Sequence, residues 1–451
     1  MKTTIKKIAV LFFVSASLLG MVSCQEEQRM LEPISAVVPS SARGGIGDLV
    51  THHFDAQTMA AKIEARLQGK VPGFGYCIVV NGQVAAANGV GKARYNVDAP
   101  QRDYSENVIQ DIGSCTKYFA ALLAMKILDG TGQPINTALE RKIYPYFPYY
   151  FNASQDFKKV TFRDLMAHTS GVINYGGALS NIEKTVEDGI NETTDPSPLA
   201  SPRPFGQYDY QNINYVLLRY CTVYLAATQN ATLNNELKAA ENVVKQAILA
   251  EADDDDDDDE FGLAVGPQTT VSVATAKNNL NIKICTWYQK LLREQIFQPA
   301  GLAQWNQVEF TAWGVPDNQK VKYYNTVNSN VQGYDSGNHL TGAAGAGGLK
   351  LSAMHMAQIV SAARANLVVQ SDLLAKMKSG DGKGNQMGFD DAFTRPHGIY
   401  YHKNGSGAGN AVLFDFDGPG VNVQLVITTN TTGSEVTNTT VWADLFDQSW
   451  K

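Results

Sequence analysis

Residues 111–128 read DIGSCTKYFAALLAMKIL, a short polar segment followed by an apolar run with helical spacing. Positions i and i+3 lie on one face of a helix, so the amine of Lys117 can reach the hydroxyl of Ser114. A serine hydroxyl is a weak nucleophile until a base removes its proton, and lysine is such a base only when its surroundings lower its pKa. The helix N-terminus adds a favourable potential for developing negative charge. Ser-x-x-Lys also occurs by chance on surface helices, so this segment needs support from the rest of the chain.

Two further segments carry groups that suit the same chemistry. Tyr210 and Asn212 stand just before a second apolar helix. A tyrosine hydroxyl can relay a proton, and an asparagine amide can hold a substrate carbonyl. Residues 403–406, KNGS, lie in a strand-like run near the C-terminus. A strand edge can donate a backbone N–H to an oxyanion, and a lysine there can attract a carboxylate. Each segment alone has a structural alternative, a helix-capping loop for the first and a glycine-rich hairpin turn for the second.

The order of these motifs, Ser-x-x-Lys, Tyr-x-Asn and Lys-x-Gly, resembles that of the serine β-lactamases, DD-peptidases and related esterases. Further segments look like landmarks of that family in the right order: Val71 to Gly73, Ile112 to Ser114, Leu165 to Gly171, Tyr215 to Leu218, Pro299 to Leu302 and Ala346 to Leu349. The resemblance extends from about His52 to the C-terminus, apart from one acidic insertion. It implies acyl transfer without a metal or an organic cofactor.

The resemblance also implies a role for each residue of the motifs. Ser114 would attack the substrate carbonyl, with Lys117 as base and Tyr210 as proton relay to and from the leaving group. Asn212 would orient the substrate amide, and Lys403 would supply positive potential. An acyl-enzyme would form and then be released by water or another acceptor.

The third motif implies further substrate contacts. The backbone N–H groups of Ser114 and Ser406 would form the oxyanion hole, and Gly405 would let the substrate approach closely. Asn404 is assigned to the substrate site too, but it stands where peptidases and lactamases have a hydroxyl residue, which weakens the case for a β-lactam or peptide carboxylate as ligand. Cys115 is an unusual neighbour for the nucleophile, and we expect its side chain to pack the helix.

His168 suggests a Ser-His-Asp site as an alternative, which we reject. Its setting at a helix end, His168-Thr169-Ser170-Gly171, is typical of a structural turn, and no Gly-x-Ser-x-Gly elbow surrounds Ser170. The lysine-based site already accounts for the chemistry.

The expected fold is α/β of the β-lactamase/transpeptidase type, a central antiparallel sheet flanked by helices beside a mainly helical subdomain. Asn81-Gly82 between two strand-like runs, 73–80 and 83–91, is a strong hairpin signal. Strand signals return near the end of the chain, at 399–404, 411–416 and 421–428, before a closing helix at 436–450. Within a hydrolase domain of residues 51–451, we therefore expect a sheet subdomain from residues 51–110 and 388–451 and a helical subdomain from residues 111–387.

An acidic insertion interrupts this plan at about residues 228–283. It contains seven consecutive aspartates, Asp253 to Asp259. Such a run repels itself and is typical of a solvated loop. A calcium site is the alternative, but the ligand spacing and turn glycine of an EF-hand are missing.

The N-terminus predicts export. Three lysines within the first seven residues precede an apolar stretch from Ile8 to Val22 that is too short for a comfortable membrane span and leads to Cys24. These features resemble a bacterial lipoprotein signal peptide of residues 1–23, with Cys24 as the lipidated residue and residues 24–50 as a flexible tether. The protein would then be lipid-anchored in the cell envelope, on its periplasmic or surface face. Ordinary cleaved secretion is the alternative.

The composition fits a globular protein of one or two domains. The chain has 451 residues, 44% hydrophobic content and a net charge of −7, which excludes a small stapled scaffold and gives no sign of nucleic-acid binding. Cys77, Cys115, Cys221 and Cys285 are expected to be buried free thiols, and disulfides are the alternative that export permits. No metal-ligand spacing links the cysteines to the seven histidines.

The sequence thus predicts an exported serine hydrolase that cleaves an ester or amide of a small-molecule or peptidoglycan-like substrate, as DD-peptidases and esterases do. Hydrolysis of β-lactam amides is the second candidate. A catalytically inactive envelope lipoprotein that binds a ligand in the same cleft is the alternative from another class. Motifs shared across the family do not separate these substrates, and the sequence leaves the oligomeric state open.

Overall fold

The Asn-Gly turn begins the central sheet. In the computed structural model, Asn81 and Gly82 both have positive φ, 48° and 84°, as a type I′ hairpin turn requires. The turn joins strands β1 (Gly73–Val80) and β2 (Gln83–Arg94), which pair antiparallel along their length. The structure describes residues 53–172, 182–188, 204–254, 271–311, 313–432 and 435–451, and all of these belong to one unit, residues 44–451.

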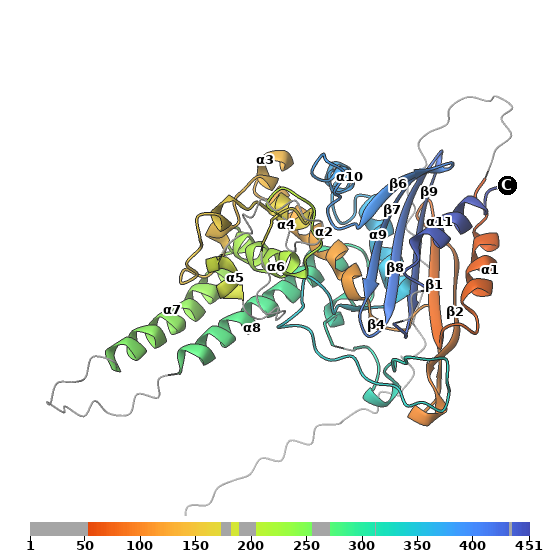
Figure 1. Ribbon diagram of the computed structural model, residues 1–451, viewed down its shortest axis with the longest axis horizontal. Coiled ribbons are helices and arrows are strands. Elements are labelled where there is room, and N and C mark those ends of the chain that lie inside the picture. Colours follow the sequence, from red (N-terminus) through yellow and green to blue (C-terminus); the bar gives the residue numbers. More distant parts are fainter. Residues whose placement is uncertain (1–52, 173–181, 189–203, 255–270, 312, 433–434) are drawn as a thin grey trace, which may run out of the picture. The chain divides into compact units, whose positions relative to one another are not determined.

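The sheet combines strands from both ends of the described chain. β1 pairs on its other side with β9 (Val421–Thr429), which continues through β8 (Asn410–Gly418) and β7 (Gly398–Ser406) to β6 (Asp391–Arg395). A short strand, β3 (Arg102–Asp103), pairs with β2 at the far edge, so the order is β3-β2-β1-β9-β8-β7-β6, antiparallel throughout (Figure 1). The predicted antiparallel sheet is confirmed, and β6 is an addition that the sequence signals did not reveal.

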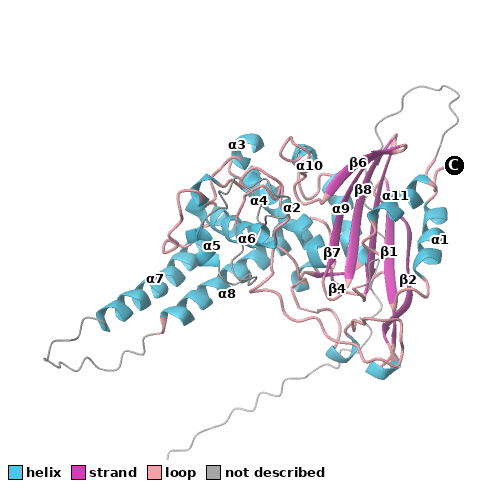
Figure 2. Cartoon of the chain, viewed as in Figure 1, coloured by secondary structure: helices cyan, strands magenta, loops and turns pink. Residues whose placement is uncertain are grey.

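Both faces of this sheet are covered. Helices α1 (Ala56–Leu67) and α11 (Thr439–Asp447) contact one face, and α9 (Ala353–Arg364) contacts the other (Figure 2). Because side chains alternate along a strand, β1 sends Phe74 and Ile78 to the first face and Cys77 and Val79 to the second, where they join separate apolar clusters.

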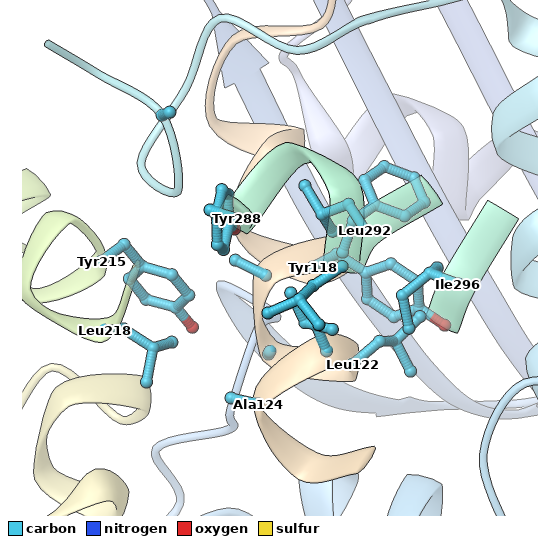
Figure 3. Packing of buried hydrophobic residues seen from close by; sticks show 14 of the residues in the cluster. Tyr118, Leu122, Ala124, Tyr215, Leu218, Tyr288, Leu292 and Ile296 are labelled. Carbon is cyan, nitrogen blue, oxygen red and sulfur yellow. The ribbon is translucent and has the colours of Figure 1, made fainter. Parts of the chain in front are cut away.

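Helix α2 (Thr116–Asp129), which follows Ser114, runs through the middle of the helical part. Nearly all of its residues are buried, which is typical of a core helix rather than a surface helix with one apolar stripe. Figure 3 shows Tyr118 and Leu122 of α2 in the same apolar cluster as Tyr215 of α6 (Asn212–Ala227) and Leu292 of α8 (Val273–Leu292). The helix that carries Lys117 is therefore fixed from several sides.

The acidic insertion is more ordered than its composition suggests. Most of residues 228–283 form α7 (Ala231–Asp254) and the first half of α8, and these two helices pack side by side (Figure 1). Leu233, Leu237 and Val244 are buried at helical spacing, and this periodicity was the available signal. The first two aspartates of the run lie in the last turn of α7, whereas Asp255 to Asp259 and the alternative calcium site lie outside the described residues.

Several shorter elements complete the described chain. A small two-stranded sheet pairs β4 (Gln110–Asp111) with β5 (Lys350–Leu351) beside the start of α2. The remaining elements are η1 (Asn96–Asp98), η2 (Gly113–Cys115), α3 (Ile135–Leu139), η3 (Tyr144–Tyr146), η4 (Phe157–Lys159), α4 (Phe162–Met166), α5 (Ile182–Asp188), η6 (Arg293–Phe297), η7 (Trp305–Gln307), η8 (Asp317–Gln319) and α10 (Ser371–Ser379).

Within the described part of the chain, no helix is both long and apolar enough to cross a membrane. The predicted signal peptide, Cys24 and the tether of residues 24–50 lie outside the described residues.

The sheet and the helical part meet through close backbone contact. A Cβ atom at Gly405 of β7 would lie 1.9 Å from the carbonyl oxygen of Ile112 and 2.8 Å from the nitrogen of Cys115. On the other side of the junction, a Cβ atom at Gly113 would lie 2.6 Å from the nitrogen of Ser406. Separations this short leave room only for glycine, so β7 and the turn before α2 hold each other in place.

We therefore expect Gly405→Ala to lower the free energy of unfolding by about 3 kcal/mol, because the added methyl group forces the two backbones apart. Urea denaturation followed by circular dichroism measures this change. Gly337→Ala is the matched control, since a Cβ atom there meets nothing within 4 Å, and it should change stability by less than about 1 kcal/mol. If the two variants were equally stable, the close backbone contact at Gly405 could not be what excludes a side chain there.

Candidate active site

The turn before α2 presents Ser114. The N–H of Gly113 donates to Oδ1 of Asp111 at 2.8 Å, and the hydroxyl of Thr116 donates to the carbonyl oxygen of Gly113 at 2.7 Å. These bonds fix the 3₁₀ turn η2, in which Ser114 is partly exposed between two buried neighbours. Lys117 follows one turn later and is fully buried, with its Nζ 3.0 Å from Oγ of Ser114. The contact expected from the i, i+3 spacing is present.

The surroundings of Lys117 suit a neutral amine. Its Nζ lies 2.7 Å from Oδ1 of Asn212 and 2.6 Å from the carbonyl oxygen of Ala346. Burial, followed by the positive charge of Lys403, holds the pKa of Lys117 well below its usual range. A neutral amine has two N–H donors and one lone pair. It can therefore donate to the two carbonyl oxygens and accept the Ser114 proton.

Tyr210 lies over this pair and beside Lys403. Its ring centroid is 4.9 Å from Nζ of Lys117, and its hydroxyl oxygen is 3.3 Å from Nζ of Lys403. Burial raises the pKa of Tyr210, while the charge of Lys403 and hydrogen bonds with Ser114 and Lys403 act in the opposite direction. The tyrosine is thus protonated at neutral pH and near the serine, as a proton relay requires.

The ring of His168 packs against the ring of Tyr210. The two ring centroids are 4.5 Å apart, and Nδ1 of His168 accepts a hydrogen bond of 3.2 Å from the backbone N–H of Gln211. Burial and the nearby charges of Lys117 and Lys403 lower the pKa of His168 well below its usual value, so the ring is neutral. Its backbone has a positive φ of 56°. This placement fits the structural turn that the sequence predicts.

Lys403 is not a free cation. It is 1% exposed, and its Nζ forms an ion pair with Oδ1 of Asp390. The other carboxylate oxygen, Oδ2, accepts a hydrogen bond of 2.7 Å from the backbone N–H of Asn404. Burial opposes the charged form of Lys403, but the charge of Asp390, its hydrogen bond with the lysine and the nearby Tyr210 and Cys115 together raise the pKa of the lysine. No motif in the sequence points to Asp390, which directly precedes β6, a strand that the sequence signals did not reveal.

The rest of the third motif contributes differently from what the resemblance implies. Side chains alternate along β7, so Asn404 shares a face with Tyr400, whereas Lys403 points to the face of the helical part. The amide of Asn404 donates to the carbonyl oxygen of Thr437 at 3.2 Å, which corrects its assignment to the substrate site. Gly405 also needs correction, because the backbone of residues 112–115 fills the space beside it.

Ser406 lies with the nucleophile. It lines the same pocket as Ser114 and Asn212, and the other lining residues are Asp111, Gly113, His339, Ala343, Ala346, Gly347, Gly348 and Gly407. The structure thus brings together Ser114, Lys117, Tyr210, Asn212, Lys403 and Ser406, and it adds Asp390.

A cluster of polar side chains around Asp111 borders the pocket. Oδ2 of Asp111 lies 3.1 Å from Nζ of Lys350 and accepts a hydrogen bond of 3.0 Å from the hydroxyl of Ser336. Burial lowers the pKa of His339, which lines the pocket beside them, so its ring is neutral. The cluster holds the carboxylate that caps the Gly113 turn. Its members are too far apart in the sequence for any motif to reveal them.

The structure also describes the four cysteines and the possible metal-binding side chains. Cys77, Cys115, Cys221 and Cys285 are buried free thiols, as predicted. The thiol of Cys115 donates to the carbonyl oxygen of Lys403 at 3.3 Å, so it packs α2 against β7. Among the residues that the structure describes, no group of three or more histidine, cysteine or acidic side chains is arranged to hold a metal ion.

Comparison with known proteins gives the context for this geometry. Residues 56–227 match the family model described as Beta-lactamase. No curated protein matches the chain.

Solved structures with a similar fold have low sequence identity. A penicillin-binding protein homologue from Pyrococcus abyssi has a TM-score of 0.52 at 18% identity, over 83% of this chain and 73% of its own. FmtA from Staphylococcus aureus has a TM-score of 0.54 at 17% identity, over 87% and 89% of the two chains. D-amino acid amidase from Ochrobactrum anthropi SV3 has a TM-score of 0.56 at 13% identity, over 87% and 98%. The chain thus has the β-lactamase/transpeptidase-like fold, and within it residues 56–227 resemble the Beta-lactamase family.

Proposed function

We propose that the protein is a serine hydrolase that forms an acyl-enzyme on Ser114 and cleaves an ester or an amide. The observation that carries the proposal is the 3.0 Å approach of Lys117 Nζ to Ser114 Oγ, in surroundings that lower the pKa of the lysine. A buried lysine held neutral beside a partly exposed serine is the arrangement that activates a hydroxyl nucleophile.

The reaction would proceed in two halves. Lys117 takes the Ser114 proton as Oγ attacks the substrate carbonyl, and the backbone N–H groups of Ser114 and Ser406 stabilise the oxyanion. The proton passes through Tyr210 to the leaving group as its bond to the carbonyl carbon breaks. Water then attacks the carbonyl carbon of the acyl-enzyme, its proton passes through the same groups to Oγ of Ser114 as the bond between Oγ and that carbon breaks, and the acid is released. Asn212 uses its Oδ1 to hold Lys117, and its Nδ2 would hold the substrate carbonyl.

Two observations bear on the substrate. The structures of similar fold include a D-amino acid amidase and penicillin-binding protein homologues, which supports an ester or amide of the DD-peptidase or esterase type as the first candidate. Hydrolysis of a β-lactam amide is the second candidate, and the description of the matching family model favours it. A ligand-binding protein without activity would have no use for the neutral Lys117.

The nucleophile is tested by treating the purified full chain with a fluorophosphonate and recording its intact mass. We expect one adduct on the wild type and none on Ser114→Ala, because only an activated hydroxyl attacks the phosphorus. Ser379→Ala removes an exposed serine that does not line the pocket of Ser114, and this variant should be labelled like the wild type. An unlabelled wild type would instead support the binding protein.

The lowered pKa of Lys117 predicts the pH dependence of labelling. The base is neutral above this pKa and protonated below it, so the labelling rate should fall as the pH decreases through a value well below the usual lysine value of about 10.4. The pKa values of Tyr210 and Lys403 are raised. Both groups therefore keep their protons in the pH range just above the pKa of Lys117, where the labelling rate is high.

Lys117→Met should no longer show this pH-dependent fall in the labelling rate. Its labelling rate should also be about a hundredfold to ten-thousandfold lower than that of the wild type. Rates of adduct formation at a series of pH values provide the measurement. A rate that rises only near the usual lysine pKa would refute the assignment of Lys117 as base.

We also propose, from residues 1–24, that the protein is exported and lipid-anchored through Cys24. Expression of the full chain in a bacterium should place the wild type in the membrane fraction with a lipid-sized increase in mass, whereas Cys24→Ala should lack that increase. Cleavage without a mass increase would favour ordinary secretion.

A further inference from the structure

Lys403 and Asp390 form a closed ion pair in the site. The lysine is almost completely buried, and both oxygens of the aspartate are engaged, one by Nζ of Lys403 and the other by the N–H of Asn404 at 2.7 Å. The backbone N–H of Asp390 donates to the carbonyl oxygen of His402 at 2.8 Å. These contacts fix the carboxylate against β7, so it cannot swing away when a substrate enters.

The other charged groups around the pocket are compensated as well. Asp111, which lines the pocket, pairs with Lys350 at 3.1 Å. Lys117 is neutral as the base of the proposed reaction, and the ring of His339 is neutral through burial. Among the described residues of this site, each cation that an incoming carboxylate could meet is therefore already paired with an aspartate.

The position of the ion pair indicates which part of a substrate meets it. Nζ of Lys403 is 3.3 Å from the hydroxyl oxygen of Tyr210, the group that would protonate the leaving group. A substrate with a carboxylate on its leaving group would thus bring that charge beside Asp390. The side chain of Asn404, which lies on the other face of the sheet, would not hold it.

We propose that Asp390 determines the substrate class by neutralising Lys403, so that the site selects esters or amides whose leaving group carries no carboxylate. The inference rests on the proposed function, because it assigns the charge preference of the same Ser114 site.

The test compares two aryl acetates whose leaving groups carry either a carboxylate or its methyl ester at the same ring position. The full chain is given the acetyl ester of meta-hydroxybenzoate, which is anionic, and the acetyl ester of methyl meta-hydroxybenzoate, which is neutral. The measured quantity is the ratio of the two kcat/KM values for each protein. A substitution that alters acetyl transfer equally for both esters does not change this ratio. We expect the wild type to cleave the neutral ester at least about tenfold faster.

Asp390→Asn removes the counter-ion of Lys403, so the carboxylate of a substrate can take its place, and it should shift the ratio about tenfold toward the anionic ester, or about 1.4 kcal/mol. The matched control is Asp391→Asn, which removes the same charge from an exposed neighbour whose Oδ1 accepts a bond from Ala392. Its ratio should stay within about twofold of that of the wild type.

Three results separate the inference from the proposed function. A wild type that prefers the anionic ester overturns the inference, and this comparison holds even if Asp390→Asn does not fold. Equal shifts in the two aspartate variants also overturn it, since they would reflect general surface charge. Failure to cleave either ester, together with no fluorophosphonate adduct on Ser114, would overturn the proposed function itself.

Discussion

The arrangement of the site depends on the contact between two backbones. Gly405 of β7 lies against Ile112 to Cys115, and Gly113 faces Ser406 across the same junction. Backbone atoms in direct contact leave no flexible side chain to adjust the distance, so the position of Ser114 relative to Lys403 follows from the packing of the sheet. Residues almost three hundred positions apart in the chain are thereby held in one site. The bond from Cys115 to the carbonyl oxygen of Lys403 strengthens the same junction.

This junction places two lysines close together, which creates an electrostatic conflict. Nζ of Lys117 and Nζ of Lys403 lie 4.9 and 4.8 Å from the centroid of the Tyr210 ring. Two buried ammonium groups so near one another are unfavourable, so at least one must lose its proton or gain a partner. Asp390 decides which one, because it stabilises the charge of Lys403 and leaves Lys117 as the group that gives up its proton. Burial is thus the largest cause that lowers the pKa of Lys117, whereas the charge of Asp390 helps to raise the pKa of Lys403.

The sequence could predict the parts of this arrangement that depend on local spacing. Ser114 and Lys117 meet because a helix brings i and i+3 together, and the Asn81-Gly82 turn identifies its hairpin because few other pairs tolerate its backbone. Asp390 could not be predicted, since its role comes from pairing across β6 and β7. The roles of Asn404 and Gly405 were wrong for a related reason. A motif gives the order of residues, but the register of the strand decides which face each one occupies.

The burial of Lys117 also bears on the choice between a hydrolase and a ligand-binding protein. Its lowered pKa means that the unfolded chain binds the lysine proton more tightly than the folded chain does, so at neutral pH the fold is less stable than it would be above the usual lysine pKa. An apolar side chain at this position would avoid that loss. A binding cleft gains nothing from a neutral amine directed at a serine hydroxyl, whereas acyl transfer requires one. The same desolvation that weakens the fold would make Lys117 a base in the proposed acyl transfer, which favours the hydrolase over the ligand-binding protein.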